Sequence, residues 1–308
     1  MGGMGGRRAT FFRGMHPSIP RRSLLGLMGA WVAGACARPP ASSPPTPAEP
    51  EQLSRIERRI GGRVGLFAIE ASSGQQLEHR ADERFAMCST FKWALAAAVL
   101  AATDRGELAL ARAIRYSEDD LQEYAPVTRS QVAAGQMSTE ALARAAVTLS
   151  DNTAANLLLA AIGGPEGLTR FFREQGDGIT RLDRIEPMLN TNEPGDPRDT
   201  TSPRAMAHTL RRVLTGNVLT SGSRDCLLGW LVAAETGASR LRAGLPAGWR
   251  AADKTGTGNR GACGDVAVFW SPTGATWFVA AYLSGSSAPL VELNAAHADI
   301  ARLIAGGA

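Results

Sequence analysis

The β-rich segments of this chain lie near its two ends, and a long helical stretch separates them. Residues 64–69 form the first segment, and residues 264–270 and 276–283 form two more that are joined by a turn containing proline and glycine. A strand from the beginning of a chain can pair with strands from its end when the residues between them fold as an insertion. The pattern therefore predicts an α/β (α+β) fold, in which an antiparallel sheet built from both chain ends is flanked by helices and carries an inserted all-helical subdomain.

Apolar periodicity predicts the helices. Residues 91–102 are apolar nearly all round, which indicates a buried helix. Further helices are expected at residues 51–60, 139–148, 153–162, 206–214, 224–234 and 292–304. We therefore expect an α/β subdomain made of residues 51–80 and 232–308, and a helical subdomain made of residues 81–231.

The beginning of the chain differs in composition from the rest. Residues 1–36 contain five arginines and no acidic residue, so the formal net charge of +4 belongs mostly to this segment and does not indicate nucleic-acid binding. A basic region that includes Arg21-Arg22, a short apolar run and small residues predict an export signal peptide at residues 1–35, and the paired arginines fit twin-arginine export. The Pro-rich residues 36–50 predict a linker. We expect an exported, periplasmic protein.

Cys36 directly follows the predicted signal peptide. Small residues before this cysteine resemble a bacterial lipoprotein processing site, and they also fit ordinary cleavage after Ala35; the sequence leaves both routes open, and with them a membrane tether through Cys36. The other three cysteines and the scattered histidines have no metal-ligand spacing, so no metal and no cofactor are expected.

Lysine is nearly absent from the chain. Of 33 Lys and Arg residues, only Lys92 and Lys254 are lysines. A guanidinium keeps its proton up to about pH 12, so a site that needs an amine able to lose its proton cannot use arginine. Lys92 stands in Ser89-Thr90-Phe91-Lys92, where the spacing places the hydroxyl and the amine on one face of the buried helix. Burial lowers the pKa of such an amine, which can then accept the proton of Ser89.

Two further motifs are ambiguous when each is taken alone. Lys254-Thr255-Gly256, followed by Thr257, fits a strand edge that a ligand can approach, and it also fits a surface turn. Ser150-Asp151-Asn152 lies on the link between two predicted helices, where it fits either a site or a helix N-cap.

In this order the three motifs resemble those of the serine penicillin-recognising enzymes, and over residues 51–305 the chain is similar to the class A β-lactamases among them. Residues 181–199 look like the class A omega loop. The resemblance implies that Glu186 is the hydrolytic carboxylate, that Asn190 is its water partner, and that Arg184 and Asp199 close the loop. It also implies an active site between the two subdomains, small-molecule β-lactam substrates, no nucleic-acid partner and a monomer.

The resemblance assigns a mechanism as well. Ser89 would attack the β-lactam ring of penicillins and cephalosporins, with the backbone N–H groups of Ser89 and Thr257 as the oxyanion hole. Ser150, helped by Lys254, would pass a proton to the departing nitrogen, and a water activated by Glu186 would hydrolyse the acyl-enzyme, which confers β-lactam resistance. Whether Lys92 or Glu186 activates Ser89 stays open, as does the substrate spectrum. The substrate-binding positions would be Tyr124, Asn152, Lys254, Thr255, Gly256, Thr257 and Arg240.

Arg240 enters this set because of a departure from the family pattern. Many class A enzymes bind the substrate carboxylate with an arginine on the strand after Lys-Thr-Gly, and the matching position here is Cys263. Arg240 aligns with a second position that supplies this guanidinium in other members, and we expect it to be an exposed cation near Lys254.

Two other activities share part of this pattern. A D,D-carboxypeptidase or transpeptidase-like penicillin-binding protein has the three motifs but lacks the loop that carries Glu186. A β-lactam sensor is acylated once without turnover, and it needs a transmembrane link to a signalling domain. The loop therefore favours hydrolysis with turnover.

Overall fold

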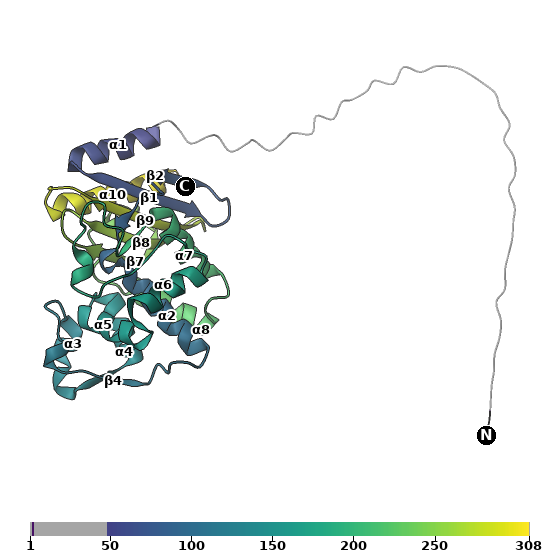
Figure 1. Ribbon diagram of the computed structural model, residues 1–308. Coiled ribbons are helices and arrows are strands. Elements are labelled where there is room, and N and C mark those ends of the chain that lie inside the picture. Colours follow the sequence, from purple (N-terminus) through teal and green to yellow (C-terminus); the bar gives the residue numbers. More distant parts are fainter. Residues whose placement is uncertain (1, 3–47, 308) are drawn as a thin grey trace, which may run out of the picture. The chain divides into compact units, whose positions relative to one another are not determined.

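Strands from both ends of the chain form one sheet in the computed structural model, which describes Gly2 and residues 48–307 (Figure 1). The predicted signal peptide beyond Gly2, Cys36 and the linker up to residue 47 lie outside the described residues. None of the described helices is long and apolar enough to cross a membrane.

The sheet has five antiparallel strands in the order β2-β1-β9-β8-β7. In its centre β1 pairs with β9, so that Phe67 lies opposite Ala280. The mixed fold with an antiparallel sheet from both chain ends, predicted from the sequence, is confirmed. The strands are β1 (Arg63–Glu70), β2 (Gln76–His79), β7 (Arg250–Thr257), β8 (Cys263–Trp270) and β9 (Thr276–Ser284).

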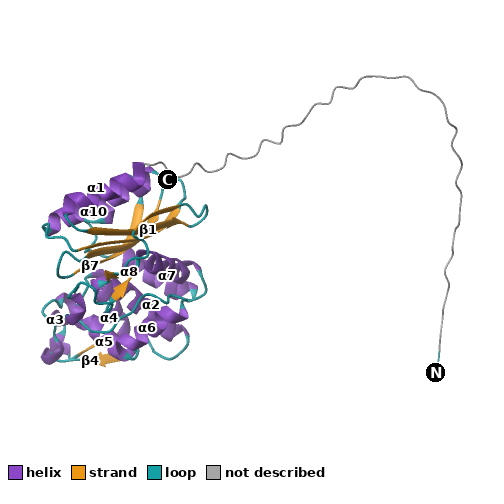
Figure 2. Ribbon diagram, turned by 45° about the horizontal axis from the view of Figure 1, so that its top comes forward, coloured by secondary structure: helices purple, strands orange, loops and turns teal. Residues whose placement is uncertain are grey.

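Helices cover both faces of this sheet (Figure 2). On one face α1 (Ala48–Ile60) and α10 (Leu290–Gly306) pack together over an apolar core that includes Phe269 and Trp277 of the sheet. The opposite face packs against the helical part of the chain, and Val266 and Phe278 enter that second core. Because both faces are covered, the central strands are continuous apolar runs rather than alternating ones.

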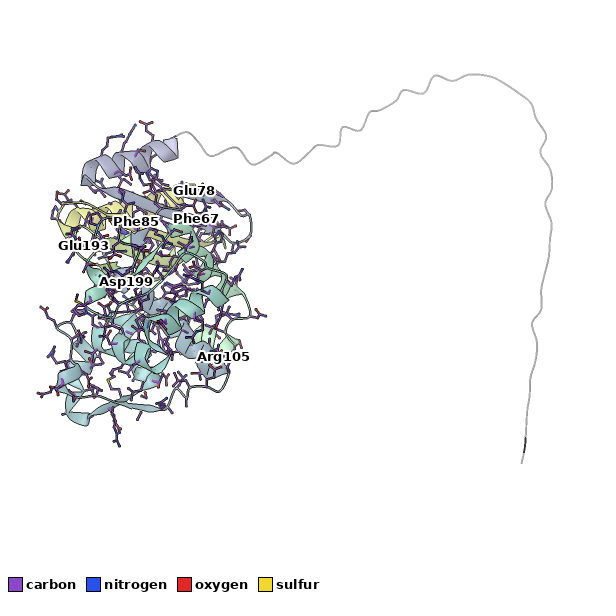
Figure 3. All side chains as sticks on the ribbon, viewed as in Figure 1. Phe67, Glu78, Phe85, Arg105, Glu193 and Asp199 are labelled. Carbon is purple, nitrogen blue, oxygen red and sulfur yellow. The ribbon has the colours of Figure 1, made fainter. Side chains whose placement is uncertain are left out.

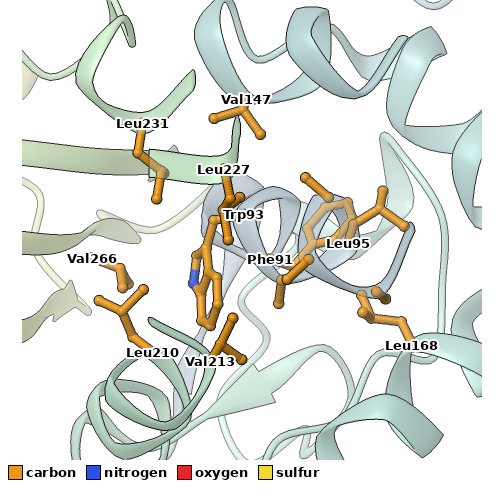
Figure 4. Close-up of a cluster of buried hydrophobic side chains, with 14 of the residues drawn as sticks. Phe91, Trp93, Leu95, Val147, Leu168, Leu210, Val213, Leu227, Leu231 and Val266 are labelled. Atoms are coloured by element: carbon orange, nitrogen blue, oxygen red, sulfur yellow. The ribbon is translucent and has the colours of Figure 1, made fainter. Parts of the chain in front are cut away.

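Helix α2 (Phe91–Asp104) runs through the middle of the helical part. Its side chains from Phe91 to Ala102 are buried, as its apolar sequence predicts. Figure 4 shows Trp93 and Leu95 among side chains from the surrounding helices and the sheet. The other helices of this part are α3 (Pro126–Ser130), α4 (Thr139–Thr148), α5 (Asn152–Ala161), α6 (Gly164–Glu174), α7 (Pro203–Thr215) and α8 (Ser221–Val232), whereas the short α9 (Leu241–Gly244) packs with α10 on the other face of the sheet.

The structure contains elements that the sequence pattern did not predict. Gly163 and Gly164 end α5 as expected, with positive φ angles of 90° and 72°, but α6 starts at once behind them. Two short strand pairs link distant segments. β3 (Phe85–Ala86) pairs with β6 (Thr200–Thr201), and β4 (Ala113–Arg115) pairs with β5 (Gln136–Ser138). The β3–β6 pair joins the chain just before Ser89 to the end of the predicted omega loop.

Candidate active site

Ser89 lies in a 3₁₀ turn, η1 (Cys88–Thr90), that leads directly into α2. Its half-buried hydroxyl donates a hydrogen bond to Glu186 Oε1 at 3.2 Å. The preceding residue, Cys88, has a φ of 44°, in the left-handed region that non-glycine residues rarely adopt. The sheet holds the turn from behind, because Thr90 Oγ1 lies 3.0 Å from the hydroxyl of Tyr282 on β9. The predicted nucleophile is therefore fixed between α2 and the sheet.

Lys92 lies one turn further along α2, and its side chain is fully buried. Its Nζ atom forms an ion pair with Glu186 Oε1 at 2.9 Å and donates to Asn152 Oδ1 at 2.5 Å and to the carbonyl of Ser150 at 2.9 Å. Burial lowers the pKa of Lys92 from its usual value, while the Glu186 carboxylate acts in the opposite direction. The side chains of Ser89 and Lys92 thus reach the same carboxylate oxygen.

Glu186 lies in the segment between α6 and a second 3₁₀ turn, η4 (Met188–Asn190), and its side chain is buried. Its Oε2 atom accepts a hydrogen bond from Asn190 Nδ2 at 2.6 Å. The other amide atom, Asn190 Oδ1, is buried and has no hydrogen-bond partner among the described residues. This oxygen can accept a hydrogen bond from a water beside the carboxylate.

Asp199 closes the segment that carries Glu186 (Asp199 is labelled in Figure 3). Its carboxylate accepts from Arg184 Nε at 2.5 Å and from the backbone N–H groups of Asp183 and Arg184 at 2.8 and 2.9 Å. Its own carbonyl accepts from the N–H of Met87 at 2.9 Å, two residues before Ser89. Asp199 is fully buried with a φ of 57°. The ion pair therefore fixes the loop end relative to the nucleophile.

Ser150 lies on the three-residue link (residues 149–151) between helices α4 and α5, and its φ of 59° directs the backbone out of the helical path. Its hydroxyl accepts hydrogen bonds from both lysines, at 3.0 Å from Lys254 Nζ and at 3.5 Å from Lys92 Nζ. Asn152, the first residue of α5, directs its Oδ1 atom at Lys92. The link thus brings a hydroxyl between two amines that lie 162 positions apart in the sequence.

Lys254 enters the site from β7, the strand at the edge of the sheet, and its side chain is fully buried. Besides Ser150 Oγ, its amine donates to the carbonyl of Thr255 at 2.8 Å, and it forms no ion pair with a described residue. Burial lowers the pKa of Lys254 to about 7, and the positive charge of Lys92 acts in the same direction. The surface turn considered for this motif is wrong, because residues 250–257 form a buried edge strand.

Gly256 lets β7 pass close to the turn that carries Ser89. A Cβ atom at this position would lie 2.7 Å from the carbonyl of Met87 and 2.9 Å from the backbone N of Ser89, so no side chain fits. Just beyond the strands, the N–H of Gly258 donates to the carbonyl of Ala262 at 2.9 Å and so extends the β7–β8 pairing by one step. Ladder bonds alternate along an antiparallel strand, so the N–H of Thr257 points to the open edge of β7. Two backbone amides, of Ser89 and Thr257, therefore border the same space.

Arg240 lies beneath this strand, and the expectation that it is exposed is wrong: the residue is only 5% exposed. Its Nη1 atom donates to the carbonyls of Gly256 and Gly264, both at 2.7 Å, and its Nη2 atom donates to Thr257 Oγ1 at 2.5 Å. Buried carbonyls need donors, and the guanidinium supplies several at once. Cys263, which stands opposite Thr257 on β8, is also buried. The guanidinium charge of Arg240 thus lies next to the side chain of Thr257.

The remaining predicted positions lie at the borders of the site. Tyr124 is 51% exposed, and its carbonyl accepts from the N–H of Asn152 at 3.0 Å. The Thr255 side chain points away from Lys254, because its Oγ1 atom lies 2.6 Å from Thr236 Oγ1. Tyr124 is therefore available at the opening of the site, whereas Thr255 contributes its carbonyl to Lys254.

Sequence reasoning missed the positioning role of Asn156, and for Asp151 it left open whether the residue belongs to a site or to a helix N-cap. Asn156 donates to the carbonyl of Glu186 and accepts from its N–H, both at 3.0 Å, and so fixes the backbone of that residue. The signal was the spacing of Asn152 and Asn156, which places both amides on one face of α5. Asp151 caps α5 through the N–H of Ala154 at 2.9 Å and also accepts from the N–H of Thr128 at 2.9 Å.

The chemistry of this site depends on a hydroxyl, two amines and a carboxylate. Within residues 48–307, no group of three or more His, Cys, Asp or Glu side chains is arranged to hold a metal ion. Ser89 can act as a nucleophile, the amines and Glu186 can transfer protons, and the two backbone amides can stabilise an oxyanion. The arrangement suits acyl transfer followed by hydrolysis.

Comparisons with known proteins agree with this chemistry. The sequence model of the β-lactamase enzyme family matches residues 50–306. Among characterised relatives, the chain is 42% identical to β-lactamase L2 of Stenotrophomonas maltophilia, over 92% of this chain and 98% of the relative. It is 44% identical to a β-lactamase of Amycolatopsis lactamdurans, over 86% of both chains.

A solved structure of high similarity is that of the last common ancestor of Gram-negative bacteria class A β-lactamase. It superimposes with a TM-score of 0.82 at 53% identity and covers 84% of this chain and 98% of the ancestral protein. The fold and about half of the aligned residues are therefore shared with that enzyme.

Proposed function

Because this chain belongs to the class A serine β-lactamases, we propose that it hydrolyses the β-lactam ring of penicillins and cephalosporins through an acyl-enzyme on Ser89. One observation carries the proposal. Ser89 Oγ, Lys92 Nζ and Asn190 Nδ2 all converge on the carboxylate of Glu186. A carboxylate that contacts both the nucleophile and the Asn190 amide can accept a proton when the ester forms and again when water hydrolyses it.

In acylation, Ser89 Oγ forms a bond to the lactam carbonyl carbon and transfers its proton to a base. Its hydrogen bond to Glu186 Oε1 favours that carboxylate as the proton acceptor. The Lys92 amine contacts the same oxygen and stabilises the charges that develop during this transfer. The N–H groups of Ser89 and Thr257 receive the developing oxyanion. Asn152 and Tyr124 line the path of the substrate side chain.

Cleavage of the ring bond needs a proton on the departing nitrogen. Ser150 supplies it, because its hydroxyl lies between Lys254 and Lys92 and can be reprotonated by either amine. The pKa of about 7 for Lys254 places this amine near the value at which it exchanges protons at neutral pH.

In deacylation, Glu186 takes a proton from a water that attacks the ester carbon; the bond from this carbon to Ser89 Oγ then breaks, and Ser89 Oγ receives the proton from Glu186. The support for this step is the buried Asn190 Oδ1, which has no partner among the described residues and lies on the amide that already binds Glu186 Oε2. A water that donates to Glu186 is thus also in reach of a second acceptor.

The substrate carboxylate is recognised by the charges beneath Thr257. Arg240 replaces the arginine expected at position 263 and orients the Thr257 hydroxyl through its 2.5 Å hydrogen bond. The leader composition supports export to the periplasm, with or without a lipid on Cys36, and the chain acts there as a monomer that confers β-lactam resistance.

Turnover of a chromogenic cephalosporin by the purified protein tests the proposal. Many turnovers per molecule are expected, followed by the same result with benzylpenicillin. A single burst equal to the enzyme concentration would instead identify a sensor. Release of the terminal D-alanine from a D-Ala-D-Ala peptide, together with slow β-lactam turnover, would identify a D,D-peptidase.

A further inference from the structure

A cavity of about 610 Å³ lies along α7, and none of the candidate active-site residues lines it. One wall is the outward face of α7, with Arg204, His208, Arg211 and Arg212 at helical spacing. The other wall is the loop of residues 175–179, which directly precedes the omega loop. The inner face of α7 is part of the core under the sheet, so this wall is rigid.

The positive charges of this cavity are only partly neutralised. Arg204 is paired with Asp82 and Glu78, at 2.9 and 2.8 Å. By contrast, Arg211 and Arg212 form no ion pair with any residue that the structure describes; Arg211 donates only to the carbonyl of Ala71, at 3.1 Å.

The carboxylate that remains in the lining, that of Asp177, accepts from uncharged donors and forms no ion pair with a described residue. Asp177 is buried, and its oxygens accept from the N–H groups of Ile179 and Thr180 and from the hydroxyls of Thr180 and Thr209. Its acceptor sites are therefore directed into the loop and α7. The open space faces guanidinium groups.

The titratable side chain of His208 lies close to these positive charges. The His208 ring packs against Phe67, with 5.0 Å between the centroids, and the Arg204 guanidinium lies 4.6 Å from the centre of the Phe67 ring. Phe67 on β1 and Glu78 on β2, which are paired neighbours and are labelled in Figure 3, show where in the sheet these contacts lie. Burial lowers the pKa of His208, and the positive charges of Arg204, Arg211 and Arg212 lower it further. All three cations are thus within electrostatic reach of one imidazole.

We propose that the cavity between α7 and residues 175–179 binds the phosphoryl group of a small polar molecule, with Arg211 and Arg212 as its cationic ligands. Two guanidinium groups match a dianion in charge, and their planar donor arrays suit phosphate oxygens. The volume exceeds that of a phosphate group, and Ile179, which is 41% exposed, provides an apolar wall for the organic part of the ligand. Gly176 leaves room for the Arg212 guanidinium, whose Nη1 atom would lie 3.2 Å from a Cβ at that position, and a Cβ at Gly178 would have nothing within 4 Å.

The test is an NMR titration of His208 in the full mature protein, with His208→Gln to assign its signal. Inorganic phosphate is added at constant ionic strength, against chloride. Bound phosphate is expected to raise the pKa of His208, because a dianion offsets the surrounding guanidinium charges. Arg211→Gln combined with Arg212→Gln should raise this pKa without phosphate and weaken phosphate binding at least about 10-fold.

A matched control is Arg58→Gln combined with Arg115→Gln, which removes the same charge from exposed positions on α1 and β4. This variant should bind phosphate as the unaltered protein does. Both double variants should retain turnover of a chromogenic cephalosporin, which shows that they are folded.

Vesicles distinguish the sources of the phosphoryl group. Stronger retention by phosphatidylglycerol than by phosphatidylcholine vesicles, lost in the Arg211/Arg212 variant only, would identify a lipid headgroup, whereas a phosphate response alone would identify a free phosphorylated molecule. The proposal is overturned if His208 responds equally to phosphate and chloride and no vesicle binding depends on the two arginines.

Discussion

The two sides of the site hold their buried lysines in different ways. On the omega side, defined here as Ser89, Lys92, Glu186 and Asn190, the amine forms an ion pair with a buried carboxylate at 2.9 Å. On the strand side, defined as Ser150, Lys254, Thr257 and Arg240, the amine contacts only a hydroxyl and a carbonyl. Both lysines are fully buried, so the difference lies in the charge of their neighbours.

Because of this difference, the two sides of the site suit different functions: proton transfer on the omega side and recognition of a negative charge on the strand side. The omega side is electrically balanced and contains its own proton acceptor, which suits proton transfer to and from Ser89 and a water. The strand side gathers Lys254 and Arg240 around Thr257 and Ser150, and it complements a substrate that brings a negative charge. The following predictions test whether chemistry and anion recognition really divide along this line.

Glu186→Ala is expected to have the largest effect, because it removes the shared proton acceptor. Turnover of benzylpenicillin should fall by about 10⁴-fold, at the upper end of general acid–base contributions, while acylation continues in part. Intact-mass spectrometry should show a covalent adduct on the protein. Normal turnover with no trapped adduct would show that Glu186 is not the deacylating base.

Lys92→Arg keeps the positive charge of the omega side but removes its titratable amine. Activity should fall by about 10³-fold, since proton transfer through this position is lost while the charge beside Glu186 remains. Steady-state kinetics with a penicillin and a cephalosporin measure the loss. Near-normal kcat would mean that Lys92 acts only as a fixed charge.

Arg240→Ala tests anion recognition on the strand side. We expect kcat/KM to fall 10- to 100-fold, the loss of about 1.5–3 kcal/mol for hydrogen bonds to a charged group. Because Arg240 is buried and donates to the carbonyls of Gly256 and Gly264, the melting temperature should fall as well. Arg302→Ala, at an exposed position of α10, is the matched control for both measurements. Unaltered kcat/KM on benzylpenicillin would leave the carboxylate without its proposed partner.

The smallest effect concerns the protonation of Lys254. With a folded pKa of about 7, its amine is charged below this pH and neutral above it, so kcat/KM should decline as pH rises through about 7. Lys254→Arg stays charged, and the decline should move to higher pH at a cost of no more than about 10-fold at pH 7. A pH profile of kcat/KM for both proteins measures this shift; superimposable profiles would exclude Lys254 as the titrating group.

The sequence allowed prediction of those elements whose apolar pattern is long. The sheet strands of residues 64–69, 264–270 and 276–283 and the buried helix α2 were predicted within a few residues. In contrast, β7 contains Asp253, Lys254 and Thr255, a polar run that resembles a turn, because its apolar neighbours come from other parts of the chain. Tertiary packing, not local pattern, makes it a strand.

The site residues followed from motif order, but their environment did not. No local pattern indicates that Arg240 is buried, since its acceptors are main-chain carbonyls on β7 and β8. For the same reason the role of Asn156 was missed: its partner is the backbone of Glu186, 30 positions further along the chain. A residue type alone does not show which distant backbone atoms its side chain contacts.

Cys88, Ser150 and Asp199 adopt left-handed backbone angles of 44°, 59° and 57°, a conformation that glycine would accept with less strain. They come from three separate segments of the chain, yet all three lie in or directly beside the candidate active site. At Ser150 and Asp199, a change to glycine would relax the backbone and remove the side chain on which the reaction or its loop depends. A change to glycine at Asp199 would leave the Arg184 guanidinium without its buried partner, so the protein would lose more stability through that contact than it gains from the relaxed backbone.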